Sequence, residues 1–234
     1  LRRGKPTVNS LWGDQAAVLM GDLIYSRASE IMGRTAKLEI VTSFARAIRK
    51  MSQGELFQLE NVANLAMTES LYLEILGAKT GSLMGASCKA PAILAGCSEE
   101  QKEALETFGF NLGVAFQLLD DALDYRGKDK LLGKKRLTDL KEGRVTLPLL
   151  RLRDKLQSKD CRRLQALLGQ SLPSPLEEKW LADILEATCA FKETMDKARS
   201  YTDKALEALG SQFEASTERQ SLENLALGLQ ERMY

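Results

Sequence analysis

The sequence predicts an all-α fold in a single domain spanning residues 1–234. Only five prolines occur in 234 residues, and the segments between them are rich in Ala, Leu, Glu, Lys and Gln, which are strong helix formers. Apolar and polar residues nowhere alternate over more than a few positions, so no strand is expected. A hydrophobic content of 44% is ample for a packed core.

Three helices are predicted in the first part of the chain. Between Leu11 and Met32, apolar residues recur at three- and four-residue steps, the spacing of one helix face. A second helix is expected from Lys37 to Leu65, with Gly54 as a candidate kink. A third should run from about Ser70 to Cys88 and end before Pro91, because proline interrupts helices.

Capping signals locate the later helices. Ser98 followed by Gln101 forms a capping-box pattern, so a long helix should begin there and reach about Tyr125. Ser174 and Glu177 repeat the pattern around a proline, which suits the first helical position. The helices predicted in the C-terminal third are Pro175–Ala190, Phe191–Leu209 and Ala215–Met233.

The composition excludes several function classes. The chain has no histidine, which rules out Ser-His-Asp and Cys-His catalysis, HExxH zinc sites and Glu-x-x-His di-iron sites. Its formal charge of +1 argues against nucleic-acid binding, which usually shows as a basic excess. The four cysteines form no Cys-x-x-Cys pair and are expected to be reduced thiols, which favours the cytoplasm.

No membrane-spanning segment is expected. The longest stretch without a charged residue, Thr107 to Leu119, has 13 residues, whereas a span needs roughly 20. The chain begins with Leu1 instead of Met. We therefore expect the true N-terminus, with any targeting signal, to lie upstream.

Three carboxylates follow the uncharged run directly. On a helix, Asp120 and Asp124 are about 40° apart and Asp121 and Asp124 about 60° apart, so all three share one face. Their repulsion, increased by the helix C-terminus, needs an opposing charge. Mg²⁺ is the natural candidate because it prefers oxygen ligands and bridges to phosphates. A solvated acidic helix end is the alternative that this pattern alone leaves open.

A basic loop follows the carboxylates. Between Arg126 and Arg144 there are eight basic and three acidic residues, a net charge of +5. A metal-binding carboxylate face beside such a loop matches what a diphosphate requires, although the loop alone could be a solvated hinge. The segment between Arg126 and Gly143 is also the one extended polar break between predicted helices. Arg2, Arg3 and Lys5 add a second cationic segment, with a fraying terminus as the alternative.

Several motifs together resemble the trans-prenyl diphosphate synthases, the polyprenyl synthetase family. The matching segments read RRGKPTVN, GDLIYSRA, QGELFQLE, Lys79-Thr80, FQLLDDALDY and LGKKRLTDLKEGRVTLPLL, and the long-chain bacterial, octaprenyl-like type looks most similar. The resemblance implies an isoprenoid synthase-type helical bundle around a central cavity. It matches Asp120, Asp121 and Asp124 to the second of two aspartate-rich, Mg²⁺-binding motifs. The N-terminal helices and the first motif are expected upstream of this chain.

The resemblance assigns diphosphate binding to cationic side chains. Arg2 is expected to contact an allylic diphosphate and Arg3 the diphosphate of isopentenyl diphosphate. Lys79, Lys134 and Arg144 are expected to hold the allylic diphosphate. The family commonly has lysine at the last of these positions, so Arg144 keeps the charge but changes the geometry.

Other roles fall on polar side chains. Thr80 and Gln117 are expected to guide the new bond or its proton loss. Glu55 and Gln58 match positions that line the cavity beside the first motif, and Asp139 is expected to be a secondary polar contact near the metals. The residues expected to be catalytic are Lys79, Thr80, Gln117 and Lys134.

The resemblance also concerns residues of the uncharged run and the residue before Thr138. Phe116 resembles a residue near the isopentenyl tail. Gly109 and Gly113, four residues apart, either admit close helix packing or leave room for a tail, and close packing is favoured. Leu137 stands where the family often has glycine two positions before Asp139, so the loop geometry is expected to differ there.

The implied reaction condenses isopentenyl diphosphate with an allylic diphosphate into a linear trans-polyprenyl diphosphate, and the family is usually homodimeric. One alternative is a class I terpene cyclase, which normally lacks the RRGKPTVN segment. A second is a non-catalytic subunit of a heteromeric synthase, although such subunits often lose aspartates that are intact here. A plain helical scaffold is the third.

Overall fold

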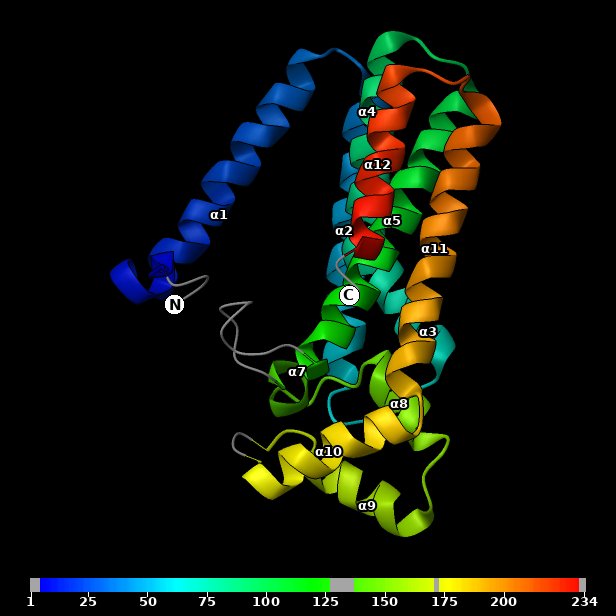
Figure 1. Cartoon of the computed structure of the whole chain (residues 1–234). Helices are drawn as coiled ribbons and strands as arrows, with labels where there is room; N and C mark the ends of the chain where they lie inside the picture. Colours follow the sequence, from blue (N-terminus) through cyan, green and yellow to red (C-terminus); the bar gives the residue numbers. More distant parts are fainter. Residues whose placement is uncertain (1–4, 127–136, 171–172, 232–234) are drawn as a thin grey trace.

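The computed structural model describes residues 5–126, 137–170 and 173–231. Within these ranges it contains helices and no β-strand, which confirms the all-α prediction (Figure 1). The helices are α1 (Val8–Arg34), α2 (Leu38–Glu60), α3 (Glu69–Leu76), the π-helix η1 (Gly77–Gly81), α4 (Ser82–Ala95), α5 (Glu99–Arg126), α7 (Thr138–Lys141), α8 (Leu147–Arg153), α9 (Ser158–Leu167), α10 (Pro175–Ala187), α11 (Ala190–Gln212) and α12 (Thr217–Glu231).

The long helix α5 is the centre of the bundle. It packs mainly against α4 and α11, while α2 covers α4 and η1. The shorter helices α8, α9 and α10 close one end of the bundle, and α1 runs beside it as a separate arm (Figure 1). None of the helices in the described part of the chain has the length and apolar character that crossing a bilayer requires.

The uncharged run from Thr107 to Leu119 lies within α5 and is largely buried. Phe108, Val114 and Leu118 are each at most 1% exposed. Burying such side chains contributes roughly 1.5–3 kcal/mol each. Asp120, the first of the three carboxylates, follows directly at the C-terminal end of this run.

Small residues bring α4 and α5 unusually close together. A Cβ atom at Gly109 would lie 2.4 Å from the Met84 carbonyl oxygen, and one at Gly113 would lie 3.0 Å from the Gly81 Cα atom. The Phe110 ring fills the groove beside Gly77 and Gly81 on η1. Close helix packing, the favoured explanation for the Gly109–Gly113 pair, is therefore confirmed.

The helix expected from Ser70 to Cys88 is wrong in two respects. It is interrupted by the π turn η1, and it continues past Pro91 to Ala95. The proline is tolerated because Ala92 and Ile93 are buried against the bundle, and this packing offsets the missing backbone hydrogen bond. The helix ends instead at Gly96, whose φ of 70° is a common C-terminal cap.

The polar break predicted between Arg126 and Gly143 is wrong in its second half. Residues 138–141 form α7, because Leu137 and Leu140 are buried in the main core cluster and anchor the segment. Helices α8 and α9 were not predicted from the sequence, and their leucines are almost fully buried.

Most other boundaries differ by only a few residues. The second helix ends at Glu60 instead of Leu65, and it continues without a break through Gly54, the candidate kink. This helix ends early because Ala63 adopts a left-handed φ of 56°, and its N–H donates to the Gly143 carbonyl, 2.7 Å away. The capping boxes at Ser98 and Ser174 are confirmed by their reciprocal hydrogen bonds.

We expect Gly109→Ala to destabilise the protein by about 3 kcal/mol, the upper end of typical overpacking costs. The added methyl group meets backbone atoms that cannot rotate away. Gly228→Ala is the matched control, because that glycine is also helical but has open space around its Cβ position. It should stabilise by roughly 0.5–1 kcal/mol. Urea unfolding of both variants checks the contrast, and equal effects would contradict the packing argument.

Candidate active site

The second residue of the aspartate motif is the most buried of the three. Asp121 is 6% exposed because its helix position faces α3. Both of its oxygens accept hydrogen bonds: Oδ1 from the Gln117 amide at 2.8 Å and Oδ2 from the Tyr72 hydroxyl at 2.7 Å. Asp124, one turn further along, accepts a bond from the Asp139 backbone N–H at 2.9 Å.

The π turn η1 positions the Lys79-Thr80 pair. A π turn contains one residue more than an α turn and often occurs at functional sites. Lys79 forms an ion pair with Glu55 at 2.6 Å and donates to the Gln58 side chain. The Thr80 hydroxyl donates to the Gln117 side chain at 3.2 Å, so α2, η1 and α5 are linked at this point.

Arg144 approaches from the opposite side. Two of its guanidinium nitrogens lie 2.8 Å from Oδ1 of Asp139, and a third pairs with Glu142. This segment begins at Leu137, which adopts a left-handed φ of 57°, a conformation that costs roughly 1–2 kcal/mol without glycine. Burial of the Leu137 side chain at 3% exposure offsets that cost.

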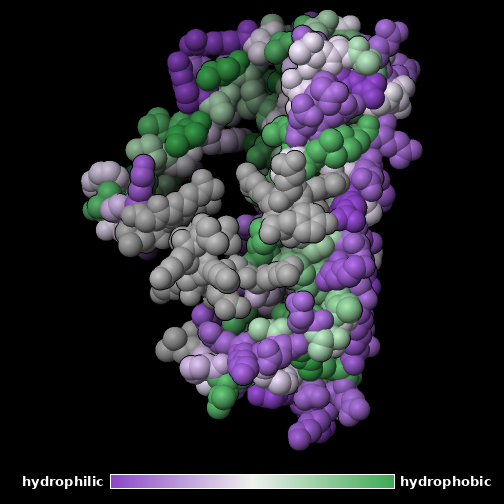
Figure 2. Space-filling model, viewed as in Figure 1, coloured by the Kyte–Doolittle hydropathy of each residue, from purple (hydrophilic) through white to green (hydrophobic). Residues whose placement is uncertain are grey.

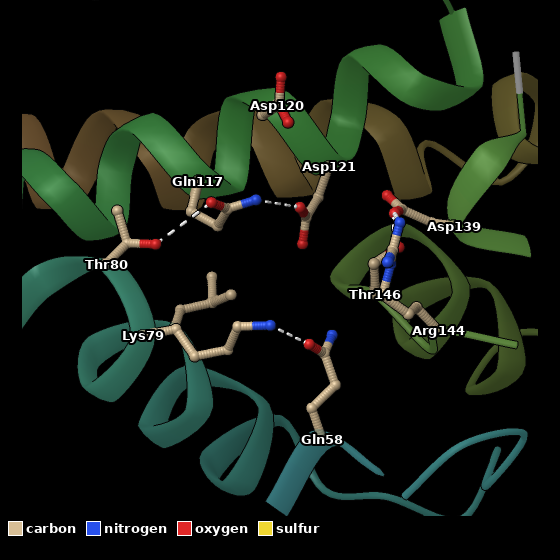
Figure 3. Close-up of a pocket in the computed structure, with 10 residues that line it drawn as sticks. Gln58, Lys79, Thr80, Gln117, Asp120, Asp121, Asp139, Arg144 and Thr146 are labelled. Carbon is tan, nitrogen blue, oxygen red and sulfur yellow. Dashed lines mark hydrogen bonds and ion pairs between the residues drawn. The ribbon is translucent and has the colours of Figure 1, made fainter. Parts of the chain in front are cut away.

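These elements enclose a cavity of about 240 Å³. In Figure 3 the Lys79 and Gln58 side chains lie on one side of it, with Gln117 and Asp121 on α5 and Arg144 beside Asp139 facing them. The carboxylate of Asp120 points away from that of Asp121 in this view. The lining residues are Gln58, Leu76, Lys79, Thr80, Gln117, Asp120, Asp121, Asp139, Arg144 and Thr146.

Burial makes these carboxyl groups weaker acids than usual. It raises the pKa of Asp121 to about 7, and the nearby Asp139 carboxylate adds to the rise. It also raises the pKa of Asp139 to about 6, where Asp124 adds to the effect and the Arg144 guanidinium opposes it. The pKa of Asp124 is likewise raised, chiefly by burial. A cation in the cavity would relieve this cost.

The donor set fits a hard divalent cation. Every anionic side chain that lines the cavity is a carboxylate, and Mg²⁺ prefers such oxygen ligands. Across the described residues, no three acidic or cysteine side chains are grouped tightly enough to complete a metal site by themselves. Mg²⁺ usually keeps several waters and takes further oxygens from substrate phosphates.

Most of the predicted site residues lie at one place. Eight of them line the cavity directly, while Glu55 and Asp124 join it through Lys79 and Asp139. Phe116 does not line the cavity and is 39% exposed on α5. Arg2, Arg3 and Lys134 lie outside the described residues.

Sequence reasoning missed two polar members of the site. Tyr72 is on α3 and bonds to Asp121, although 49 residues separate them in the chain. Thr146 precedes α8, lines the cavity and donates to the Tyr125 hydroxyl at 3.1 Å. A polar side chain within an apolar run, as in SLYLEIL, is the sequence signal that could have identified Tyr72.

The family model described as Polyprenyl synthetase matches residues 1–185. The chain is similar to the octaprenyl diphosphate synthase of Escherichia coli (strain K12), with 36% identity over 89% of this chain and 64% of that protein. It is also similar to the all-trans-nonaprenyl-diphosphate synthase (geranyl-diphosphate specific) of Rhodobacter capsulatus, with 35% identity over 96% of this chain and 68% of that protein. The chain thus spans 64% of the length of the first of these relatives.

Solved structures of a decaprenyl diphosphate synthase and a polyprenyl synthase are also similar to this chain. A decaprenyl diphosphate synthase from Rhodobacter capsulatus superposes with a TM-score of 0.92 and 30% identity, covering 100% of this chain and 72% of that one. A polyprenyl synthase from Caulobacter crescentus CB15, complexed with calcium and isoprenyl diphosphate, has a TM-score of 0.91 and 37% identity, covering 98% and 70%. The isoprenoid synthase-type bundle is therefore confirmed.

The raised pKa of Asp121 predicts how stability depends on pH. In metal-free protein the native state binds this proton more tightly than the unfolded chain, so its contribution to the free energy of unfolding falls as pH rises from about 4 to about 7. The Asp121→Asn variant should lack this pH-dependent decrease in the free energy of unfolding, which is on the order of a few kcal/mol. Denaturant titrations with EDTA at several pH values measure the difference between the two proteins.

Asp203→Asn serves as the control for this measurement, since Asp203 is exposed on α11. Its pH profile should parallel that of the unchanged protein. A difference between Asp121→Asn and the unchanged protein that does not vary with pH would contradict the assignment.

Proposed function

Because the chain belongs to the polyprenyl synthetase family, we propose that the protein is a prenyltransferase. It condenses isopentenyl diphosphate with an allylic diphosphate and builds a linear trans-polyprenyl diphosphate of the long-chain type. The observation that carries the proposal is the cavity, where Lys79 and Arg144 face the carboxylates of α5. The names of the relatives support the same chemistry.

The cationic side chains hold the allylic diphosphate in this proposal. Its C–O bond breaks, and the bonding electrons leave with the diphosphate oxygen. Lys79 and Arg144 stabilise the developing negative charge, an effect that is strongest in a site from which water is excluded. Lys134, Arg2 and Arg3 supply further diphosphate contacts, with Arg3 on isopentenyl diphosphate.

The carboxylates Asp120, Asp121 and Asp124 hold Mg²⁺. When bound, Mg²⁺ neutralises charge on the diphosphate and makes it a better leaving group. Asp139 adds negative charge beside the motif and orients Arg144 through their paired nitrogen–oxygen contacts. This leaves Arg144 pointed at the cavity.

The new carbon–carbon bond forms when the isopentenyl double bond attacks the allylic cation. Loss of a proton from the adjacent carbon restores a double bond, and the departing diphosphate accepts that proton. Thr80 and Gln117, bonded to each other at 3.2 Å, contribute polar groups beside the reacting carbons. Gln58 completes the cavity wall, and Glu55 holds Lys79 through their ion pair.

We also propose that the protein is a homodimer. Every described residue of α1 is at least partly exposed, and its large apolar side chains are mostly more than half exposed. Figure 2 shows apolar residues gathered along this arm. Exposed apolar area of this kind marks an interaction surface, and a second copy of the chain is the proposed occupant.

The cytoplasm is the proposed location. All four cysteines are free, as expected in a reducing compartment.

Asp121→Asn should lower prenyl elongation by about 100-fold or more, the scale of losing one preorganised electrostatic group. The variant should still fold, because a neutral amide suits the buried position better than a carboxylate. Full-length protein is incubated with isopentenyl and allylic diphosphates plus Mg²⁺, and the products are sized. Removing Mg²⁺ with EDTA should abolish elongation.

The matched control is Asp203→Asn on α11, which should elongate normally. The proposal fails if the unchanged protein makes no product, or if Asp121→Asn elongates as well as the control.

The dimer proposal predicts a mass twice that of one chain by light scattering coupled to size exclusion. The double variant Leu19→Glu/Leu23→Glu places charges one turn apart on α1 and should shift the protein to the monomer. Leu176→Glu is the control, since that leucine is 78% exposed on α10 and should leave the dimer intact. A monomeric unchanged protein would refute the dimer.

A further inference from the structure

The orientation of the Asp121 carboxylate is determined by two donors on different helices. Gln117 lies one turn earlier on α5 itself, so its bond to Oδ1 moves together with the helix. Tyr72 lies on α3, and its hydroxyl donates to Oδ2 at 2.7 Å. A carboxylate held at both oxygens cannot rotate freely about its terminal bond.

The Tyr72 hydroxyl is itself held in place. The ring is 3% exposed within the main core cluster, among side chains that fix its plane. The buried ring holds the hydroxyl where it donates to Asp121, so α3 and α5 are joined by this one bond.

Each carboxylate oxygen has a further acceptor direction beyond the bond it receives. Asp121 lines the cavity and points into it (Figure 3). With one direction on Oδ2 occupied by Tyr72 and one on Oδ1 by Gln117, the remaining directions are available to a cation. Hydrogen bonds of this kind to metal-binding carboxylates typically alter metal affinity by 10- to 100-fold when removed.

We propose that Tyr72 is a positioning residue for the cation site: its hydroxyl, donating to Oδ2, fixes the Asp121 carboxylate in the orientation that binds a divalent cation together with diphosphate. This role rests on the proposed function of the cavity. A purely structural tyrosine would only satisfy its own buried hydroxyl group. In the proposed role, the affinity for the cation depends on Tyr72 although Tyr72 does not touch the cation.

The test compares Tyr72→Phe with the unchanged chain. Mn²⁺ binding in the presence of inorganic diphosphate is followed by the loss of the free-ion EPR signal. We expect Tyr72→Phe to weaken Mn²⁺ binding by about 10-fold. Ile75→Val is the matched control, because it removes one methylene group from the same buried face of α3 and touches no carboxylate. It should lower thermal stability and leave Mn²⁺ affinity unchanged.

A double-mutant cycle with Asp121→Asn separates positioning from a general structural effect. In the Asp121→Asn background, Tyr72→Phe should weaken Mn²⁺ binding no further. Tyr72→Phe alone leaves the buried Asp121 carboxylate without its Tyr72 donor and could fail to fold for that reason. The Asp121→Asn background removes that charge, so Mn²⁺ binding can still be measured in the double variant.

The possible outcomes are distinct. Equal Mn²⁺ affinities for Tyr72→Phe and the unchanged chain would overturn the positioning role while leaving the proposed function standing. An additional loss in the Asp121→Asn background, or an equal loss in Ile75→Val, would overturn it as well. An unchanged chain that binds no Mn²⁺ with diphosphate would overturn the proposed function itself.

Discussion

The burial of a carboxyl group just after the uncharged stretch of α5 is the constraint on which the rest of this site depends. Asp121 is 6% exposed, and burial raises its pKa to about 7. An isolated buried charge is costly unless it is bonded or paired. The surrounding structure meets this requirement with the Tyr72 and Gln117 donors, and a cation would meet it further. The same desolvation cost that lowers the stability of the metal-free protein would favour binding of a cation.

Close helix packing makes this arrangement possible. Gly109 and Gly113 let α5 approach α4 and η1 until backbone atoms meet. This approach brings Thr80 within hydrogen-bond distance of Gln117. The π turn at Lys79 then directs a second cationic group to the cavity that Arg144 enters from the other side. Side chains from five helices and the loop before α8 act together because the glycines leave no gap between the central helices.

The cations of the cavity are already paired. Lys79 contacts Glu55, and Arg144 contacts Asp139 and Glu142. In the proposed function, a diphosphate would exchange with these carboxylates instead of meeting unpaired charges. Such pairs hold long side chains near their working positions, so less conformational freedom is lost on binding. Partly exposed pairs of this kind are individually weak, which makes the exchange feasible.

The sequence was sufficient for the helical class, because helix propensity and capping are local properties. The boxes at Ser98 and Ser174 formed as predicted. The sequence was also sufficient to place Asp120, Asp121 and Asp124 on one helix, since that requires only the helical period. It failed at Pro91 and at the π turn, where packing against α5 outweighs local preference.

Tertiary structure alone decided which of the three aspartates is buried and what holds it. Tyr72 and Asp121 are 49 residues apart, and no periodicity links them. Leu137 adopts a left-handed backbone conformation that its residue type disfavours, because burial of its side chain outweighs the local cost. The sequence by itself determined the helices and the charges they carry. The folded chain determined which charges lose their water, because desolvation depends on neighbours that are distant along the chain.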